Sequence, residues 1–328
     1  MQAQIQSITY NEFLPSIGVV LEAYTSSGYN SSINPSVSNE FTLLVAFASG
    51  SQMSDSWLQL NETGVEIESG NLDLRQGFWT QQPLTDAGGI EPTIRGAVAT
   101  VQREMDVEIN PSLRNLMSGA AWGGWMDDCA MDIQRGRDRG LPDYNSLRSS
   151  LGLEPITNWS NLTSDIEMQQ VLAIVYNNVS ELDAYIGVLV EPRLNGSIYG
   201  ETQQVLALDQ FSRLRDGDRM WYRNDADLVS LYDEIDTIRL SDIILRNSRI
   251  ESIQCDVFFA ERGASGTQCQ LENVDSVVEP VTETTSSSPI IQSMIGVFLV
   301  IVLLGVAAMV VRRQEAKHFG KKIDLEEE

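Results

Sequence analysis

The stretch from residue 290 to residue 311, IIQSMIGVFLVIVLLGVAAMVV, contains 22 residues and no charged side chain. An apolar run of about 20 residues is long enough to cross the roughly 30 Å hydrocarbon core of a bilayer as a helix. Arg312 and Arg313 follow directly, as expected for the cytosolic flank of a membrane span. The sequence therefore predicts one transmembrane helix at 290–311, in preference to a buried globular helix, with a short cytosolic tail at 312–328.

The segment just before this helix, 273–289, is rich in serine, threonine and proline, a composition typical of a solvated linker. It predicts a stalk that places the N-terminal bulk of the protein in an extracellular or lumenal compartment. Asparagine sequons in such a compartment are candidates for glycosylation. The chain has six sequons before the stalk, at Asn30, Asn61, Asn158, Asn161, Asn178 and Asn195.

The chain has three cysteines and one histidine, in no spacing that suits a structural zinc site. Cys255 and Cys269 enclose a short loop, within 254–272, that a disulfide could close in an oxidising compartment. Cys129 is left over, and we expect it to be buried and unreactive. The histidine is His318, which lies beyond the predicted membrane helix.

Acidic residues dominate the charge, with 46 Asp and Glu against 22 Lys and Arg and a formal net charge of −24. Such a chain repels phosphate backbones, so a nucleic-acid partner is not expected. Apolar residues recur at three- and four-residue spacing in several segments, which predicts a mainly α fold with few strands. These segments lie near 38–48, 112–134, 165–177, 203–215 and 239–247.

Glycine and proline mark the expected helix ends. The opening residues suggest an amphipathic helix that stops at Pro15, and the runs 84–92 and 136–143 predict structured turns. In the second run, Gly136 and Gly140 should break a helix that carries Arg135.

The segment AMDIQRGRDRGLPDYNSLR, residues 130–148, closely resembles the signature of the animal haem peroxidase family. Four further blocks resemble family sequence in family order: ITYNEFLPSIG (8–18), NPSVSNEFTLLVAF (34–47), GGIEPTIRG (88–96) and DQFSRLRDGDRMWYRND (209–225). The resemblance spans about residues 5–255. It implies that residues 1–253 are the C-terminal part of a multi-helix peroxidase domain, with haem as cofactor and peroxide-dependent oxidation as activity.

The resemblance also shows where the chain departs from the family. Ser51 stands at the position of the family's proximal histidine, and Asp132 stands where an asparagine normally orients that histidine. Arg135 matches an arginine near a haem propionate, although an internal brace to an aspartate is an equal alternative. Substitute axial ligands can be imagined, but their types and helical spacing are more typical of core packing; they are Met53, Met126, Met131 and Cys129.

The resemblance further implies that the family's distal histidine and arginine and its calcium-binding loop would precede Met1. The first residues, MQAQIQSITYNEFLP, lack the basic and apolar regions of a secretory signal. We therefore expect the chain to be a fragment of a longer protein, whose missing N-terminal half would be a partner.

Two functions compete. The first is a membrane-anchored peroxidase-family protein that is incomplete or catalytically impaired as this chain, similar to the peroxidase-like domain of dual oxidases in lacking the proximal histidine. The alternative is a haem-free pseudoperoxidase that acts as an extracellular adhesion or interaction module. Whether the chain is an enzyme stays open at this point.

Overall fold

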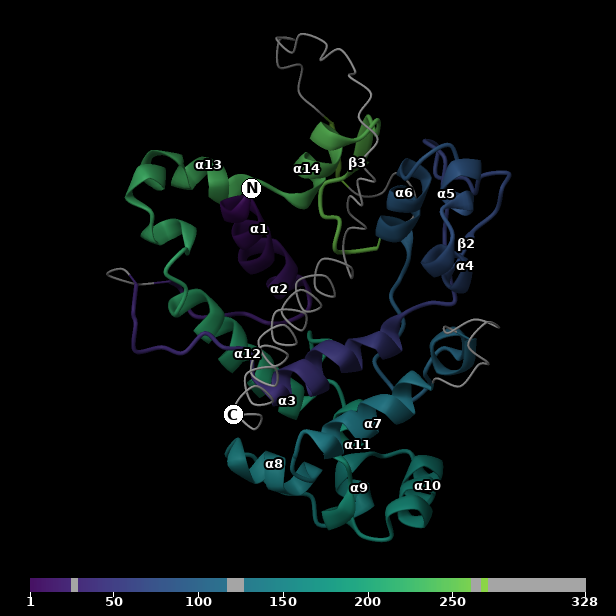
Figure 1. The fold of residues 1–328 in the computed structure, drawn as a ribbon, viewed down its shortest axis with the longest axis vertical. Helices are drawn as coiled ribbons and strands as arrows, with labels where there is room; N and C mark the ends of the chain where they lie inside the picture. Colours follow the sequence, from purple (N-terminus) through teal and green to yellow (C-terminus); the bar gives the residue numbers. More distant parts are fainter. Residues whose placement is uncertain (25–28, 117–126, 261–266, 271–328) are drawn as a thin grey trace, which may run out of the picture. The chain divides into compact units, whose positions relative to one another are not determined.

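The computed structural model describes residues 1–24, 29–116, 127–260 and 267–270, which belong to one compact unit, Met1–Leu271. Helices dominate it (Figure 1). The α-helices are α1 (Gln2–Ile8), α2 (Leu14–Ser16), α3 (Asn39–Phe41), α4 (Leu74–Trp79), α5 (Gln82–Asp86), α6 (Glu91–Ala99), α7 (Asp128–Asp138), α8 (Tyr144–Ser150), α9 (Trp159–Leu162), α10 (Ile166–Tyr176), α11 (Ala184–Val190), α12 (Glu201–Asp216), α13 (Tyr232–Thr237) and α14 (Leu240–Asn247). The prediction of a mainly α fold is confirmed.

Shorter helical turns of other pitch join or extend these helices. In the described part of the chain the π-helical turns are η1 (Thr9–Phe13), η2 (Thr42–Phe47) and η4 (Ser112–Leu116). The 3₁₀ turns described there are η3 (Ala48–Gln52), η6 (Val179–Glu181), η7 (Tyr222–Asn224) and η8 (Ala226–Leu231). Helix α3 thus continues through η2 into η3, which makes residues 39–52 one long helical segment.

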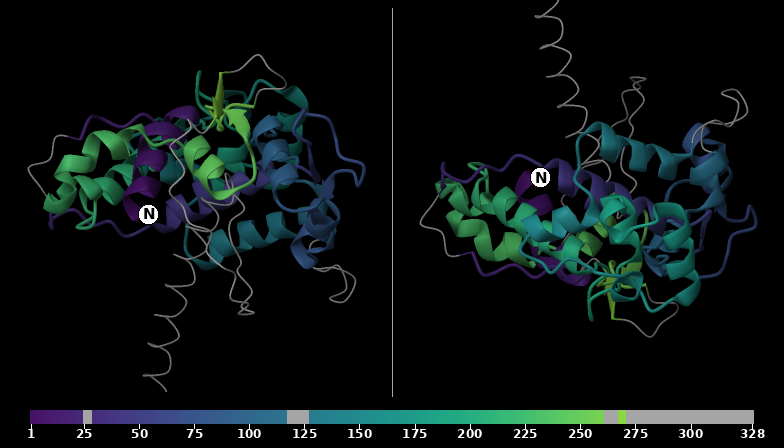
Figure 2. Two further views of the ribbon diagram at one scale, coloured as in Figure 1. Left: turned by 90° about the horizontal axis from the view of Figure 1, so that it is seen from above. Right: turned by 90° about the horizontal axis from the view of Figure 1, so that it is seen from below.

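The two ends of the described chain pack together. Helix α1 contacts α13, and α3 contacts α12, so the purple and green segments lie side by side in Figure 1 and in both views of Figure 2. Tyr10 of η1 packs edge-on against Trp221 with ring centroids 4.8 Å apart, and its hydroxyl donates to the carbonyl of Phe211 at 3.0 Å. Aromatic packing of this kind contributes beyond the buried area alone.

Strands are few and short among the described residues. Strand β1 (Ser56–Trp57) pairs with β2 (Leu72–Asp73), and β3 (Ser252–Gln254) pairs with β4 (Gln268–Gln270), both antiparallel. The disulfide between Cys255 and Cys269 lies at the second pair, with a Cα–Cα distance of 4.9 Å. It therefore closes the loop that leaves β3 and returns as β4, which is the pairing singled out from the sequence.

One predicted helix end is wrong and another is right within the same run. Helix α7 continues through Gly136 and ends at Asp138. Gly140 then takes φ +71°, a value that favours glycine because it has no Cβ. The N–H of Leu141 donates to the carbonyl of Gly136 at 2.9 Å, and the N–H of Gly140 donates to Arg137 at 3.1 Å. This is a Schellman cap, so Gly136 stays helical because its carbonyl is needed to close the cap.

The other helix predictions agree with the described residues, with small shifts of the ends. The segment 203–215 lies in α12, 239–247 in α14, and 165–177 in α10. Pro15 lies one residue before the end of α2. The segment 112–134 contains η4 and most of α7, and its centre, 117–126, lies outside the described residues.

Within the described part of the chain, no helix combines the length and the apolar character that a membrane span needs. The predicted stalk, membrane helix and tail at 273–289, 290–311 and 312–328 lie outside the described residues. The same holds for 261–266 of the loop between the two disulfide cysteines.

Candidate functional site

The segment that should carry the proximal ligand is the helical run from α3 to η3. Ser38 caps its start by accepting from the N–H of Phe41 at 3.1 Å. Leu43 and Leu44 are fully buried, and Ala48 is too, so the segment is fixed in the core. Ser51 is 1 % exposed, and its hydroxyl donates to the carbonyl of Ala48 at 2.9 Å. The serine side chain is thus turned back on its own helix.

Asp132 lies on α7, which packs against η2. It is 7 % exposed, forms an ion pair with Arg135 one turn later, and accepts from the Tyr185 hydroxyl of α11 at 3.3 Å. Burial raises the pKa of Asp132 to about 6, and the nearby Arg135 opposes that shift. The aspartate is therefore held by two partners in the position where the family has an asparagine.

Arg135 makes its contacts inside the protein. Its guanidinium carbon lies 4.5 Å from the ring centroid of Phe47, in cation–π geometry, while its NH1 group pairs with Asp132. Of the two roles expected for Arg135, the structure shows the aspartate brace. The propionate contact stays a prediction.

Two of the sulfur side chains near this site pack with apolar residues. Met53 is 8 % exposed and packs with Leu74, Ile109 and Leu113. Cys129, which we expected to be buried, is only partly buried, and it packs against the same cluster. Burial raises the pKa of the Cys129 thiol to about 11, so at neutral pH it is a poor nucleophile and ligand. Met126 lies outside the described residues.

Haem fits these residues poorly. The chain's one histidine, His318, follows the 290–311 run, so no imidazole is available from residues 1–289 to bind iron. Ser51 offers a hydroxyl that is already bonded to its own helix. Among the described residues, no group of three His, Cys, Asp or Glu side chains could hold a metal ion.

A second buried polar cluster adjoins the signature. Glu191 is 4 % exposed and accepts from the Tyr144 hydroxyl at 2.5 Å, the Thr202 hydroxyl at 2.8 Å and the Thr202 N–H at 3.0 Å. Arg148 approaches it to 3.6 Å and also pairs with the Glu201 carboxylate at 2.6 Å. Burial raises the pKa of Glu191, and its hydrogen bonds oppose the shift. With its partners all internal, this cluster braces α8 against the start of α12.

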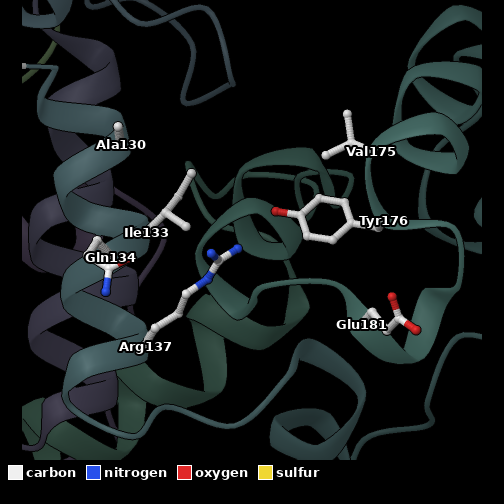
Figure 3. A pocket seen from close by; sticks show the side chains of 7 residues that line it. All are labelled: Ala130, Ile133, Gln134, Arg137, Val175, Tyr176 and Glu181. Carbon is white, nitrogen blue, oxygen red and sulfur yellow. The ribbon is translucent and has the colours of Figure 1, made fainter.

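A pocket of about 530 Å³ lies between α7 and α10. Arg137 and Tyr176 approach each other across it (Figure 3), because both bind Asp183. The Arg137 guanidinium pairs with both carboxylate oxygens, at 2.9 and 2.6 Å, and the Tyr176 hydroxyl donates to one of them at 2.9 Å. The apolar wall comes from Ala130, Ile133 and Val175.

The sequons lie at the surface. Asn61 is partly buried and the other five asparagines are exposed. Asn30, Asn61, Asn158 and Asn178 each accept a hydrogen bond from the hydroxyl of the sequon's own serine or threonine. Their glycosylation stays a prediction.

Sequence reasoning offered an aspartate partner for Arg135 without naming Asp132, and it missed Tyr185, Glu191 and Asp183. Each of these lies more than forty residues from its partner in the signature. Their residue types carry no local pattern, so only the packing of α11 beside α7 and α8 reveals them. The sequence does place three arginines close together in the signature, at 135, 137 and 139, and such a group needs carboxylate partners.

Comparison with known proteins agrees with the fold and the signature. The family model for animal haem peroxidases matches residues 1–258. Peroxinectin A of Dictyostelium discoideum is 35 % identical over 256 residues, covering 78 % of this chain and 47 % of that protein. Human eosinophil peroxidase is 30 % identical over 272 residues, covering 79 % of this chain and 38 % of that protein.

Among solved structures, peroxidase A of Dictyostelium discoideum superimposes with a TM-score of 0.70 at 35 % identity, covering 78 % of this chain and 49 % of that one. The fatty acid α-dioxygenase of Arabidopsis thaliana has a TM-score of 0.62 at 18 % identity, which shows a shared fold alone. The chain spans about half the length, or less, of the relatives it matches. It belongs to the animal haem peroxidase family.

Proposed function

We propose that this chain is a membrane-tethered, catalytically impaired member of the peroxidase family that acts as an extracellular interaction module. The observation that carries the proposal is Ser51. It stands at the position of the proximal ligand and is 1 % exposed, and its hydroxyl donates a hydrogen bond to the Ala48 carbonyl. A buried side chain bonded in this way cannot replace an imidazole as an iron ligand without rearranging η3.

The neighbouring positions support the same proposal. Asp132 is bonded by Arg135 and Tyr185, so it serves the packing of α7 and α11.

The tether and the extracellular location are supported by independent features. The uncharged run at 290–311 is followed by Arg312 and Arg313. The bond between Cys255 and Cys269 is of a kind that persists in oxidising compartments. The exposed sequons suit a glycosylated surface.

Absorption spectroscopy tests the haem-free part of the proposal. The full-length membrane protein, purified in detergent and shown to be folded by circular dichroism, would be titrated with haemin and assayed by pyridine haemochrome. We expect no stoichiometric Soret band and no oxidation of a phenol donor by hydrogen peroxide. Stoichiometric haem in folded protein would refute the proposal and support a haem protein with unusual ligation, the second candidate, which the 1–258 family match favours.

A further inference from the structure

Helix α10 exposes an apolar stripe. Of its 11 residues only Leu172 is buried, whereas Val171, Ile174 and Val175 are 48 %, 83 % and 66 % exposed. The spacing of these three residues, i, i+3 and i+4, places them on one helix face. With Ile166, which is 68 % exposed, this short helix has four exposed aliphatic side chains. Single exposed apolar residues are common on protein surfaces, whereas a group of them marks a surface that can bind.

The stripe continues into the pocket between α7 and α10. Val175 belongs to both, and it faces Ala130 and Ile133 of α7 across the pocket (Figure 3). The result is a hollow of about 530 Å³ whose lining is apolar at Ala130, Ile133 and Val175 and polar in the rest. A hollow between two helices with such a mixed lining suits an amphipathic third helix.

The exposed charges at the start of α10 and at the edge of the hollow are acidic. Its basic residue, Arg137, is neutralised by the two bonds to Asp183. Asp165 and Glu167 at the start of α10 are exposed, as is Glu181 at the pocket's edge. The chain as a whole carries a net charge of −24. A partner that docks here therefore gains from positive charge, and a second copy or an anionic lipid surface would be repelled.

We propose that the α10 stripe and the α7–α10 pocket form a docking site for a basic amphipathic helix of a partner protein. The proposal rests on the interaction-module function and names its surface and the chemistry of its partner. Apolar anchors at i, i+3 and i+4 of the partner would contact Ile174 and Val175, and lysine or arginine side chains would face Glu167 and Glu181.

Fluorescence anisotropy with a labelled 14-residue peptide of leucine and lysine, patterned as an amphipathic helix, tests the site on the full-length protein. We expect saturable binding that weakens as salt rises, because ion pairing at an exposed rim is screened. The double variant Ile174→Ser, Val175→Ser should bind at least about tenfold more weakly. Both side chains are exposed, so their replacement should leave the thermal midpoint unchanged.

Two controls decide whether the site is specific. The matched variant Val65→Ser, Val101→Ser changes two residues that are also exposed, at 59 % and 75 %, and should bind the peptide like the unmodified protein. The same peptide with glutamate in place of lysine should bind at least about tenfold more weakly. Equal loss in both double variants, no loss in the α10 variant, or equal binding of the two peptides overturns the proposal.

The other occupants and the underlying function have separate readouts. Self-association, or binding to phosphatidylcholine vesicles, that disappears in the α10 variant would assign the stripe to a second copy or to lipid and would overturn the basic helix. Haemin titration of the same preparation reports on the interaction-module function independently. Haem uptake with unchanged peptide binding would refute the interaction-module function and leave the docking site standing. Absence of haem together with absence of peptide binding would overturn the docking site and leave the interaction-module function standing.

Discussion

Replacing Tyr144 by phenylalanine tests whether the buried Glu191 cluster stabilises the fold. The variant keeps the ring, which packs against Gly187, and removes the hydroxyl. That hydroxyl donates to Glu191 at 2.5 Å and accepts a longer, weaker bond from the Thr202 hydroxyl at 3.5 Å. Glu191 is 4 % exposed, so water cannot easily replace the lost donor. A hydrogen bond to a charged group contributes about 1.5–3 kcal/mol. We therefore expect a loss of roughly 2 kcal/mol in the free energy of unfolding.

In thermal unfolding of the full chain in detergent, followed by circular dichroism, that loss corresponds to a decrease in Tm of roughly 4–8 °C for a unit of this size. The loss should also depend on pH. Burial raises the pKa of Glu191 and the Tyr144 bond lowers it, so the bond favours the charged carboxylate. The destabilisation should thus be larger at pH 8 than at pH 5.

The control is Tyr176→Phe, which removes a similar bond at the edge of the α7–α10 pocket. The Tyr176 hydroxyl donates to Asp183 at 2.9 Å, but Arg137 keeps both oxygens of that carboxylate paired. We expect a loss of less than about 1 kcal/mol there. Equal losses in the two variants would contradict the assignment of Glu191 as a buried brace.

Three further predictions concern the same unit. Burial raises the pKa of Asp132 to about 6, compared with about 3.9 in an unfolded chain. Between these two pH values the folded chain keeps a proton that the unfolded chain loses, so stability should fall as pH rises. The variant Asp132→Asn should flatten this pH dependence, which is measured as the urea midpoint at a series of pH values. Gly187→Ala places a Cβ 2.3 Å from the Tyr144 ring and should cost about 1–3 kcal/mol in urea unfolding. Replacing Cys255 and Cys269 by serine opens a loop of sequence separation 14 and should cost up to ~3 kcal/mol, which reduction of the unmodified protein should reproduce.

Periodicity located the helices because apolar residues that share one helix face repeat in sequence, whatever that face packs against. The segments 203–215 and 239–247 became α12 and α14 for this reason. The end of α7 was harder. Gly136 and Gly140 look alike in sequence, but a Schellman cap needs the left-handed residue after the last helical turn, and only Gly140 has that backbone.

The candidate site divides in the same way. The sequence states directly that position 51 is a serine and not a histidine. It also places Asp132 and Arg135 three residues apart, which is one turn of a helix, so their closeness can be expected. The partners Tyr185 and Glu191 come from α11 and its C-terminal end. Their positions depend on how α11 packs against α7 and α8, and no local sequence pattern predicts that packing.

Helix α10 shows what periodicity leaves open. The segment 165–177 was located by the spacing of its apolar residues, and spacing cannot state what covers those residues. In α12, Leu206 and Ala207 are buried, and the helix contacts α3 and η2. In α10 the described chain leaves the apolar stripe exposed beside the α7–α10 pocket. An exposed stripe of this kind favours association with another surface. The same apolar spacing thus belongs to a packed helix in α12 and to the proposed binding surface in α10. The two cases differ in the charges beside the helix and in the elements that pack against it.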